Sequence, residues 1–409
     1  MIINLSPKMK ILILSELFYP HGSGAELATW LYVKMLAEEG FKITVVTSKF
    51  PNESSFEVLN ERIRIYRLPI NVMIGTRYCT LVNVGTLMSN LLNKLIKWSD
   101  IVYIPGGWFS VIPLVKVHKK PLIVHLHNYS IICPTSLLYD FANMSVGKCS
   151  LRSFMLHEYI EKRRSLPSVI ASCFINELFG KHYSKLARSA DVLIFVSKAQ
   201  MELILSEIPS LKEKSYMIYN PIPDLPYVKS EQKGIGYLGG KSFVKGFHIL
   251  IRALKMLRRD TLEAYFTKAS KELKRLRLTN GILINLLPKT NLEDVMKKIS
   301  ITVVPSLWPE PLPYALIESM LYGKLIVASN IGGIPEIASN HLSGVKLVKP
   351  GDHTEIANAL DHFLSLSLEE FNEIGAKNRE YVLRKMSNEE ILRNFIKILC
   401  NAIVNSGQK

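Results

Sequence analysis

Short apolar runs alternate along this chain with longer amphipathic stretches. The first run, Lys10 to Ser15, is apolar between its ends, as in a parallel strand that is buried on both faces. Residues Ala25 to Glu39 have helical periodicity, and Gly40 behind them is a typical helix stop. Another apolar run follows at 41–47. This strand–helix–strand order predicts a right-handed βαβ unit and a parallel sheet.

The same alternation continues in two sets. Further strands of the first set are predicted at 101–104, 122–127, 192–197 and 216–219. Those of the second set are predicted at 234–240, 264–266, 282–284, 301–304 and 325–328. A proline-rich segment, Asn220 to Pro226, separates the two sets. We therefore expect an α/β protein with two doubly wound, Rossmann-like domains, 1–226 and 227–385, which face each other across a ligand-binding cleft.

Two basic stretches interrupt this rhythm. Residues 148–188 interleave lysines and arginines with aromatic side chains, and residues 255–277 contain many cations and few acids. Amphipathic helical surfaces are the simplest interpretation of both. A patch that faces a membrane or an acceptor is the alternative for the first.

Composition and charge restrict the class of protein. The 409 residues are 48% apolar and 21% charged, enough for large cores. The net charge of +16 favours contact with phosphates, nucleic acid or anionic lipid, although solubility alone also accounts for it. No RNP, zinc-finger or helix-turn-helix pattern occurs, so we expect no specific nucleic-acid partner.

The cysteines and the apolar stretches suggest where the protein works. Five cysteines, Cys79 among them, show no metal-finger or C-x-x-C spacing, which fits a reducing compartment. No secretory signal is visible, and the longest apolar stretch, Ile101 to Val117, contains prolines and glycines. We expect a cytoplasmic protein, with the cytoplasmic membrane surface as the alternative location.

Two carboxylates, Glu310 and Glu318, flank a predicted helix start in the second half. Glu310 follows the 301–304 strand, Pro313 suits the first turn of a helix, and Glu318 lies just over a turn into it. The amides at the positive end of that helix belong to Leu312, Tyr314 and Ala315. The segment thus offers carboxylates for sugar hydroxyls and N–H groups for a diphosphate. Two solvated helix carboxylates are the simpler alternative.

Three further segments are candidate binding elements. A strand ends in Gly239-Gly240-Lys241, and Lys245 opens the following helix, so a phosphate could approach the backbone there. Gly22 and Gly24 give the first strand a similar turn, which lacks the dinucleotide fingerprint. His127 ends a strand and could donate a hydrogen bond to a substrate. Plain turns and a structural histidine remain the alternatives.

These segments, in this order, resemble the retaining glycosyltransferases of family 4, which have the GT-B fold. The resemblance covers nearly the whole chain. The matching motifs are Gly22-Ser23-Gly24-Ala25-Glu26, His127-Asn128-Tyr129 with Cys133-Pro134, Gly239-Gly240 with Lys245-Gly246, the E-x7-E pair Glu310 and Glu318 between Pro305-Ser306 and Gly323, and Gly332-Gly333-Ile334-Pro335-Glu336.

The resemblance implies the transfer of a hexose, with retention, from a nucleoside-diphosphate sugar to a glycan or lipid-linked acceptor. It implies that Glu310 contacts the donor sugar, Glu318 the ribose and Lys245 the diphosphate, while His127 lies near the reacting sugar. It also implies that a C-terminal helix, 386–409, packs back on the first domain. The residues expected to bind the donor are Gly22, Gly24, Gly239, Gly240, Lys241, Leu312, Tyr314, Ala315 and Glu318. No D-x-D or metal-ligand spacing occurs, so we expect neither a metal nor a cofactor.

Three departures from the family pattern keep other functions open. Gly240 stands where a clamp arginine is usual, Pro313 removes one amide, and the strand near Phe266 lacks a terminal glycine. A non-catalytic GT-B subunit that binds a partner enzyme or a glycan is one alternative. A sugar-nucleotide epimerase of the same fold is another.

Overall fold

The computed structural model describes residues 9–70, 89–258, 261–288 and 292–407. Cys79 and the N-terminal segment, on which part of the expected location rests, lie outside these ranges. The chain divides into two compact units. The first unit contains residues 1–136, 170–221 and 388–409, and the second contains 137–169 and 222–387. The sequence predicted a first domain that runs unbroken to residue 226, whereas residues 137–169 group with the second unit.

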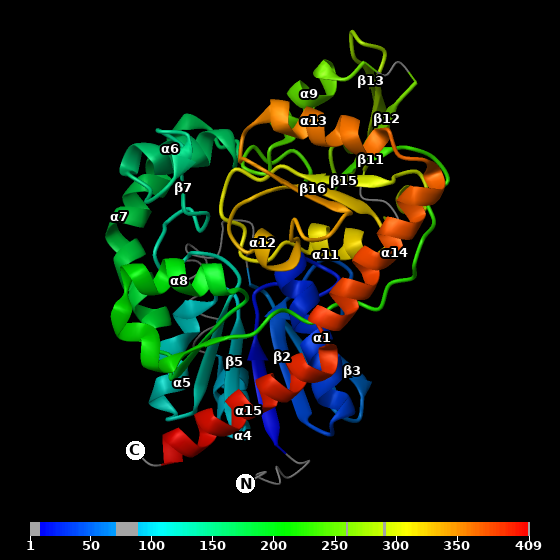
Figure 1. Ribbon diagram of the computed structural model, residues 1–409. Helices are drawn as coiled ribbons and strands as arrows, with labels where there is room; N and C mark the ends of the chain where they lie inside the picture. Colours follow the sequence, from blue (N-terminus) through cyan, green and yellow to red (C-terminus); the bar gives the residue numbers. More distant parts are fainter. Residues whose placement is uncertain (1–8, 71–88, 259–260, 289–291, 408–409) are drawn as a thin grey trace. The chain divides into compact units, whose positions relative to one another are not determined.

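The first unit is built on a sheet of eight strands in the order β10-β9-β6-β5-β1-β2-β4-β3 (Figure 1). All neighbours are parallel except the β3–β4 pair. The strands are β1 (Lys10–Leu14), β2 (Lys42–Ser48), β3 (Phe56–Asn60), β4 (Ile63–Leu68), β5 (Ile101–Pro105), β6 (Leu122–Leu126), β9 (Val192–Phe195) and β10 (Ser215–Met217). The central strands β1, β5, β6 and β9 are buried almost throughout, as a parallel sheet that is covered on both faces requires.

Helices cover this sheet. They are α1 (Gly24–Glu38), α4 (Asn90–Trp98), α5 (Ile112–Val117), α8 (Lys198–Glu207), α15 (Asn388–Gly407) and most of α7 (Leu166–Arg188). Gly40 has a φ of 97° and its amide donates to the Ala37 carbonyl, which confirms the predicted helix stop. The final helix α15 contributes Phe395, which packs against Tyr32 of α1 and Tyr103 of β5 at centroid distances of 4.5 and 5.2 Å.

The second unit has a seven-stranded sheet in the order β13-β14-β12-β11-β15-β16-β17. Only the edge strand β13 is antiparallel to its neighbour. The strands are β11 (Ile235–Tyr237), β12 (Glu263–Phe266), β13 (Lys274–Arg277), β14 (Leu283–Leu286), β15 (Ile301–Val304), β16 (Leu325–Ser329) and β17 (Val345–Val348). The order β12-β11-β15 places the β11 and β15 carboxyl ends side by side, and ligands of doubly wound sheets bind at that edge.

Two helix pairs accompany this sheet. Helix α9 (Phe247–Met256) packs against α13 (His353–Leu364), and α11 (Tyr314–Leu321) packs against α14 (Leu368–Lys385) (Figure 1). Buried side chains of α9, α13 and the strands form one continuous apolar core. The remaining elements are α6 (Leu151–Ile160), α10 (Leu292–Met296), α12 (Ile334–Ile337) and the small β7–β8 hairpin (Tyr139–Asp140 and Ser145–Val146). Both units therefore have the predicted doubly wound α/β architecture.

The two basic stretches have different outcomes. Residues 148–188 are mainly helical, as α6 and α7, which confirms the helical interpretation. The helical interpretation of 255–277 is wrong, because this stretch contains the end of α9 and the strands β12 and β13. All four β13 side chains are exposed, and the strand forms through backbone pairing with β14. A strand held only by its backbone leaves no apolar alternation in the sequence.

Candidate functional site

Glu310 is the best-defined polar group at the carboxyl edge of the second sheet. It lies behind β15 and is only 5% exposed. The Ser306 hydroxyl donates to its Oε1, and Lys245 Nζ lies 4.0 Å from its Oε2. A buried carboxylate needs such partners to remain charged. The structure therefore brings the side chains of two predicted site residues, Glu310 and Lys245, within 4.0 Å of each other.

Two glycines allow the backbone to hold Glu310 in place. Gly332 has a φ of 59°, and a Cβ there would lie 2.5 Å from the Glu310 carbonyl oxygen. The Gly333 amide donates to that same carbonyl at 2.8 Å. The Gly332-Gly333 motif, which lies 22 residues beyond Glu310 in the sequence, thus works as the support of the Glu310 loop.

A similar close approach fixes Lys245. Gly246 has a φ of 76°, and a Cβ there would lie 1.9 Å from the Pro305 carbonyl oxygen. The β11 loop therefore rests directly on the β15 loop that carries Ser306 and Glu310. The Tyr237 hydroxyl also donates to the Lys245 carbonyl at 3.3 Å. Burial, with the nearby charges of Glu310 and Glu161, raises the pKa of Tyr237 well above its usual value, so this hydroxyl keeps its proton.

Glu161 is a supporting residue that the sequence did not reveal. It follows α6 in the 137–169 segment, and its carboxylate accepts hydrogen bonds from the Ser242 hydroxyl at 2.5 Å and the Phe243 amide at 2.9 Å. Both donors lie in the β11 loop between Lys241 and Lys245. The insertion thus anchors the loop that presents the lysines. The two hydrogen bonds join residues 81 and 82 positions apart, so no local sequence pattern marks Glu161.

Gly240 occupies the position at which the family resemblance implies a clamp arginine. Gly240 adopts a left-handed φ of 66°, and a Cβ there would lie 3.4 Å from the Lys268 carbonyl oxygen and 3.8 Å from Lys268 Cβ. Lys268 follows β12 and is exposed. Its own φ is 54°, which is uncommon for a residue other than glycine. A cation absent at 240 is therefore present on the neighbouring loop, at the strand end where the family pattern has glycine.

The predicted α11 segment forms as expected in outline. Pro313 precedes the helix, and its carbonyl accepts from the Leu316 and Ile317 amides at 3.1 and 3.4 Å. Leu312 and Tyr314 are buried at its start, beside Ala315. Burial raises the pKa of Glu318 to about 7, and the nearby charge of Lys268 opposes this rise. Glu318 therefore titrates in the physiological range and has Lys268 as a charged neighbour.

In the glycine loop of the first unit, the Glu26 carboxylate accepts a hydrogen bond from a backbone amide of the same loop. The Ser23 amide donates to Glu26 Oε2 at 2.6 Å, so this amide already has a carboxylate partner. A Cβ on Gly22 would lie 2.4 Å from the Glu26 side chain, which explains the glycine. Glu16, behind β1, is only 4% exposed, and burial together with the charge of Glu26 raises its pKa well above the usual value. The anion site expected near Gly22 and Gly24 is thus lined by acids.

His127 follows β6 and has neutral surroundings. Burial lowers its pKa to about 4. Its Nε2 is buried and has no hydrogen-bond partner among the described residues. The loop behind it is fixed by Gln200 of α8, whose amide donates to the carbonyls of Leu126 and Asn128 at 3.0 and 3.1 Å. The ring is therefore an uncharged imidazole with one nitrogen left to bond a ligand.

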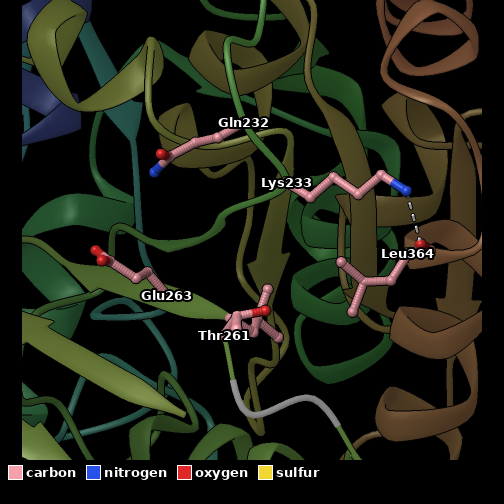
Figure 2. A pocket seen from close by; sticks show the side chains of 6 residues that line it. Gln232, Lys233, Thr261, Glu263 and Leu364 are labelled. Atoms are coloured by element: carbon pink, nitrogen blue, oxygen red, sulfur yellow. Dashed lines mark hydrogen bonds between the residues drawn. The ribbon is translucent and has the colours of Figure 1, made fainter.

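A cavity of about 300 Å³ lies elsewhere in the second unit (Figure 2). Its lining includes Gln232, Lys233 and Glu263, which come at or before the amino ends of β11 and β12. Figure 2 shows Lys233 reaching the Leu364 carbonyl, to which its Nζ donates at 3.2 Å. This edge is opposite to the one that carries Glu310, so the cavity is separate from the candidate site. In the ranges that the structure describes, no three His, Cys, Asp or Glu side chains gather as metal ligands.

Known proteins share sequence and fold with this chain. Residues 227–381 match the family described as Glycosyl transferases group 1. An uncharacterized 42.6 kDa protein from the cps region of Klebsiella pneumoniae is 24% identical over 338 residues, which are 81% of this chain and 87% of that protein.

Solved structures show the same fold. Sucrose-phosphate synthase from Thermosynechococcus elongatus superposes with a TM-score of 0.71 at 15% identity, covering 97% of this chain and 100% of that one. HepE from Anabaena, in complex with UDP-glucose, superposes with a TM-score of 0.65 at 18% identity, covering 96% and 100%. Residues 227–381, in the second unit, thus match the glycosyl transferases group 1 family, and the two Rossmann-like units have the GT-B fold.

Proposed function

We propose that this protein is a retaining glycosyltransferase that moves a hexose from a nucleoside-diphosphate sugar to a glycan or lipid-linked acceptor. The arrangement of Glu310 and Lys245 carries this proposal. A sugar diphosphate needs a carboxylate for its hydroxyls and cations for its phosphates, and this pair supplies both 4.0 Å apart at the ligand-binding edge of the sheet. HepE, which shares the fold, is solved with UDP-glucose.

Each residue then has a role that follows from its surroundings. Glu310, oriented by Ser306, accepts hydrogen bonds from the sugar hydroxyls. Lys245 faces the diphosphate, and Lys268 supplies the second cation that Gly240 does not. Glu318 accepts from the ribose. The neutral His127 ring, which cannot repel a developing positive charge on the sugar, donates or accepts a hydrogen bond near the reacting carbon.

The reaction balances without a protein nucleophile. The bond between the sugar C1 and the diphosphate oxygen breaks, and the acceptor oxygen bonds to C1 on the face that the diphosphate leaves. The acceptor proton passes to the departing phosphate oxygen. Lys245 and Lys268 stabilise the negative charge that grows on the diphosphate. Stabilisation of developing charge by fixed charges is usually the largest single contribution to the catalysis of such a step.

A donor screen tests the proposal. The full chain is mixed with UDP-, GDP- and ADP-sugars, and its melting temperature is measured, since a ligand that binds the folded state stabilises it. We expect one nucleotide class to raise the melting temperature. The products formed with that donor are then analysed for a new glycosidic bond, and we expect turnover to be unchanged by a metal chelator.

Two other outcomes would replace the proposal. Gly240 in place of arginine favours a non-catalytic GT-B subunit, and the absence of binding to any nucleotide sugar would support that function. An altered free sugar nucleotide without a new glycosidic bond would identify an epimerase. Inversion at the anomeric carbon would contradict the retaining stereochemistry and would leave the proposed glycosyl transfer itself standing.

The expected location is also part of the proposal. Among the described residues, no helix is long and apolar enough to cross a membrane. We propose a cytoplasmic protein whose contact with a membrane, where it occurs, is peripheral. Separation of cell lysate into soluble and membrane fractions, with and without a high-salt wash, tests this proposal.

A further inference from the structure

The outward face of α7 in the first unit is unusually apolar. Ile170, Phe174 and Leu178 are 58%, 66% and 56% exposed. Soluble proteins tolerate single exposed apolar side chains, but a contiguous row of large ones generally marks a surface that contacts something.

These side chains form a row along the helix. At ~100° per residue, positions four apart differ by only ~40°, so Ile170, Phe174 and Leu178 share one face. The buried positions of the same helix, Ser172, Tyr183 and Ala187, lie roughly on the opposite side by the same rule. The apolar row therefore faces away from the first-unit core.

Cations continue the same face toward the helix end. Lys181 and Lys185 lie ~20° and ~60° from Ile170 around the axis, and both are exposed. Glu177 is the acid on this part of the face. A row of large apolar groups that passes into lysines has the composition of helices that lie in the interface of an anionic membrane. The chain as a whole, with a net charge of +16, is attracted to the same surface.

We propose that this face of α7, residues Ile170 to Lys185, docks on a bilayer surface that contains anionic lipid. The apolar row enters the boundary between headgroups and acyl chains, while Lys181 and Lys185 reach the headgroup phosphates. Charge decides between a bilayer and a second copy of this chain, because a copy with a charge of +16 repels its partner. The docking names a surface for the peripheral membrane contact proposed above, and it does not depend on the proposed transfer reaction.

Vesicle co-sedimentation of the full chain tests the proposal. We compare vesicles of neutral phosphatidylcholine with vesicles that also contain phosphatidylglycerol. Wild type is expected to bind the anionic vesicles and to bind the neutral ones at least tenfold more weakly, with the difference shrinking at high salt. The double variant Phe174→Ser/Leu178→Ser is expected to lose about tenfold or more in partitioning. Lys181→Gln/Lys185→Gln should lose about fivefold per lysine.

Matched substitutions elsewhere in the first unit separate this face from general effects. Val117, which is 74% exposed on α5, is replaced by serine, and Lys94 and Lys97 of α4 are replaced by glutamine. These controls should partition within about twofold of wild type if docking is specific to α7. All variants change exposed side chains, and their melting temperatures verify folding.

Three results would overturn the proposal. Wild type could fail to bind anionic vesicles, or the α7 variants could bind as wild type does. The full chain could also form a dimer in solution that Phe174→Ser/Leu178→Ser dissociates, which would identify a second copy as the occupant of this face. The donor screen is independent of all three results, so a failure here leaves the proposed function untouched.

Discussion

The strand-end loops of the two units differ in their charge. In the second unit, Lys245 lies 4.0 Å from the buried carboxylate of Glu310, which also accepts a hydrogen bond from Ser306, and Lys268 is a charged neighbour of Glu318. In the first unit, the loop amide of Ser23 is bonded to Glu26, and the acid Glu16 lies buried behind it.

The same backbone architecture is thus used in two electrostatic ways. A glycine turn before a helix can receive an anion, but the charges around it decide whether it does. The second-unit loops are cationic and suit a diphosphate. In the first-unit loop the Ser23 amide is already bonded to Glu26, and the His127 ring behind β6 is neutral.

Removing the Glu310 charge should give the largest effect on the comparison. We expect Glu310→Gln to lower turnover by about 100-fold and to change the donor Kd much less, because the carboxylate acts on the sugar and not on the phosphates. Steady-state kinetics and calorimetry measure the two quantities. Glu373→Gln, an exposed acid of α14, is the matched control. Unchanged turnover with a weakened Kd would exclude the role on the donor sugar.

Removing the second-unit cations sharpens the comparison next. Lys245→Ala and Lys268→Ala should each lower the affinity for UDP by roughly tenfold, since each removes a charge-assisted contact to phosphate. Neither variant should lower the affinity for uridine. Lys377→Ala on α14 controls for net charge. If wild type binds UDP more tightly than uridine and Lys268→Ala retains that difference, Lys268 has no part in the clamp.

The pH dependence of Glu318 should have a smaller effect. Its pKa of about 7 means that the carboxylate, which accepts from the ribose, forms between pH 6 and 8. Donor-sugar affinity should therefore rise about fivefold to tenfold over that range, and Glu318→Gln should remove the dependence. The raised pKa also means that wild type loses stability as pH rises from the ordinary carboxyl value through 7. Glu318→Gln should therefore melt higher than wild type at pH 8.

The first-unit loop should give the smallest effect. Glu26→Ala should lower the free energy of unfolding by about 1 kcal/mol, because it removes the cap at the start of α1. Donor affinity should stay within about twofold. Denaturant unfolding and calorimetry test both, with Glu38→Ala at the far end of α1 as the control. A large loss of donor affinity would break the contrast between the two loops.

Some features of the site followed from the sequence because they depend on residues close together in the chain. Apolar runs fixed the parallel strands, and Gly40 fixed a helix stop. The position of Glu310 behind one strand and of Lys245 behind another predicted one common edge, since parallel strands end there together. The 4.0 Å distance between Lys245 Nζ and Glu310 Oε2 agrees with this prediction.

Other features depended on residues that only the fold brings together. Glu161, which lies 81 residues before Ser242, accepts hydrogen bonds from the β11 loop, and Gly332 leaves space for the Glu310 carbonyl. Whether a cation neighbours a glycine turn also depends on tertiary packing, as Lys268 beside Gly240 shows. The sequence by itself determined the α/β pattern and the candidate carboxylates through local periodicity and strand ends. The tertiary structure alone decided their partners and burial, because pKa values and close backbone contacts arise between segments distant in the chain.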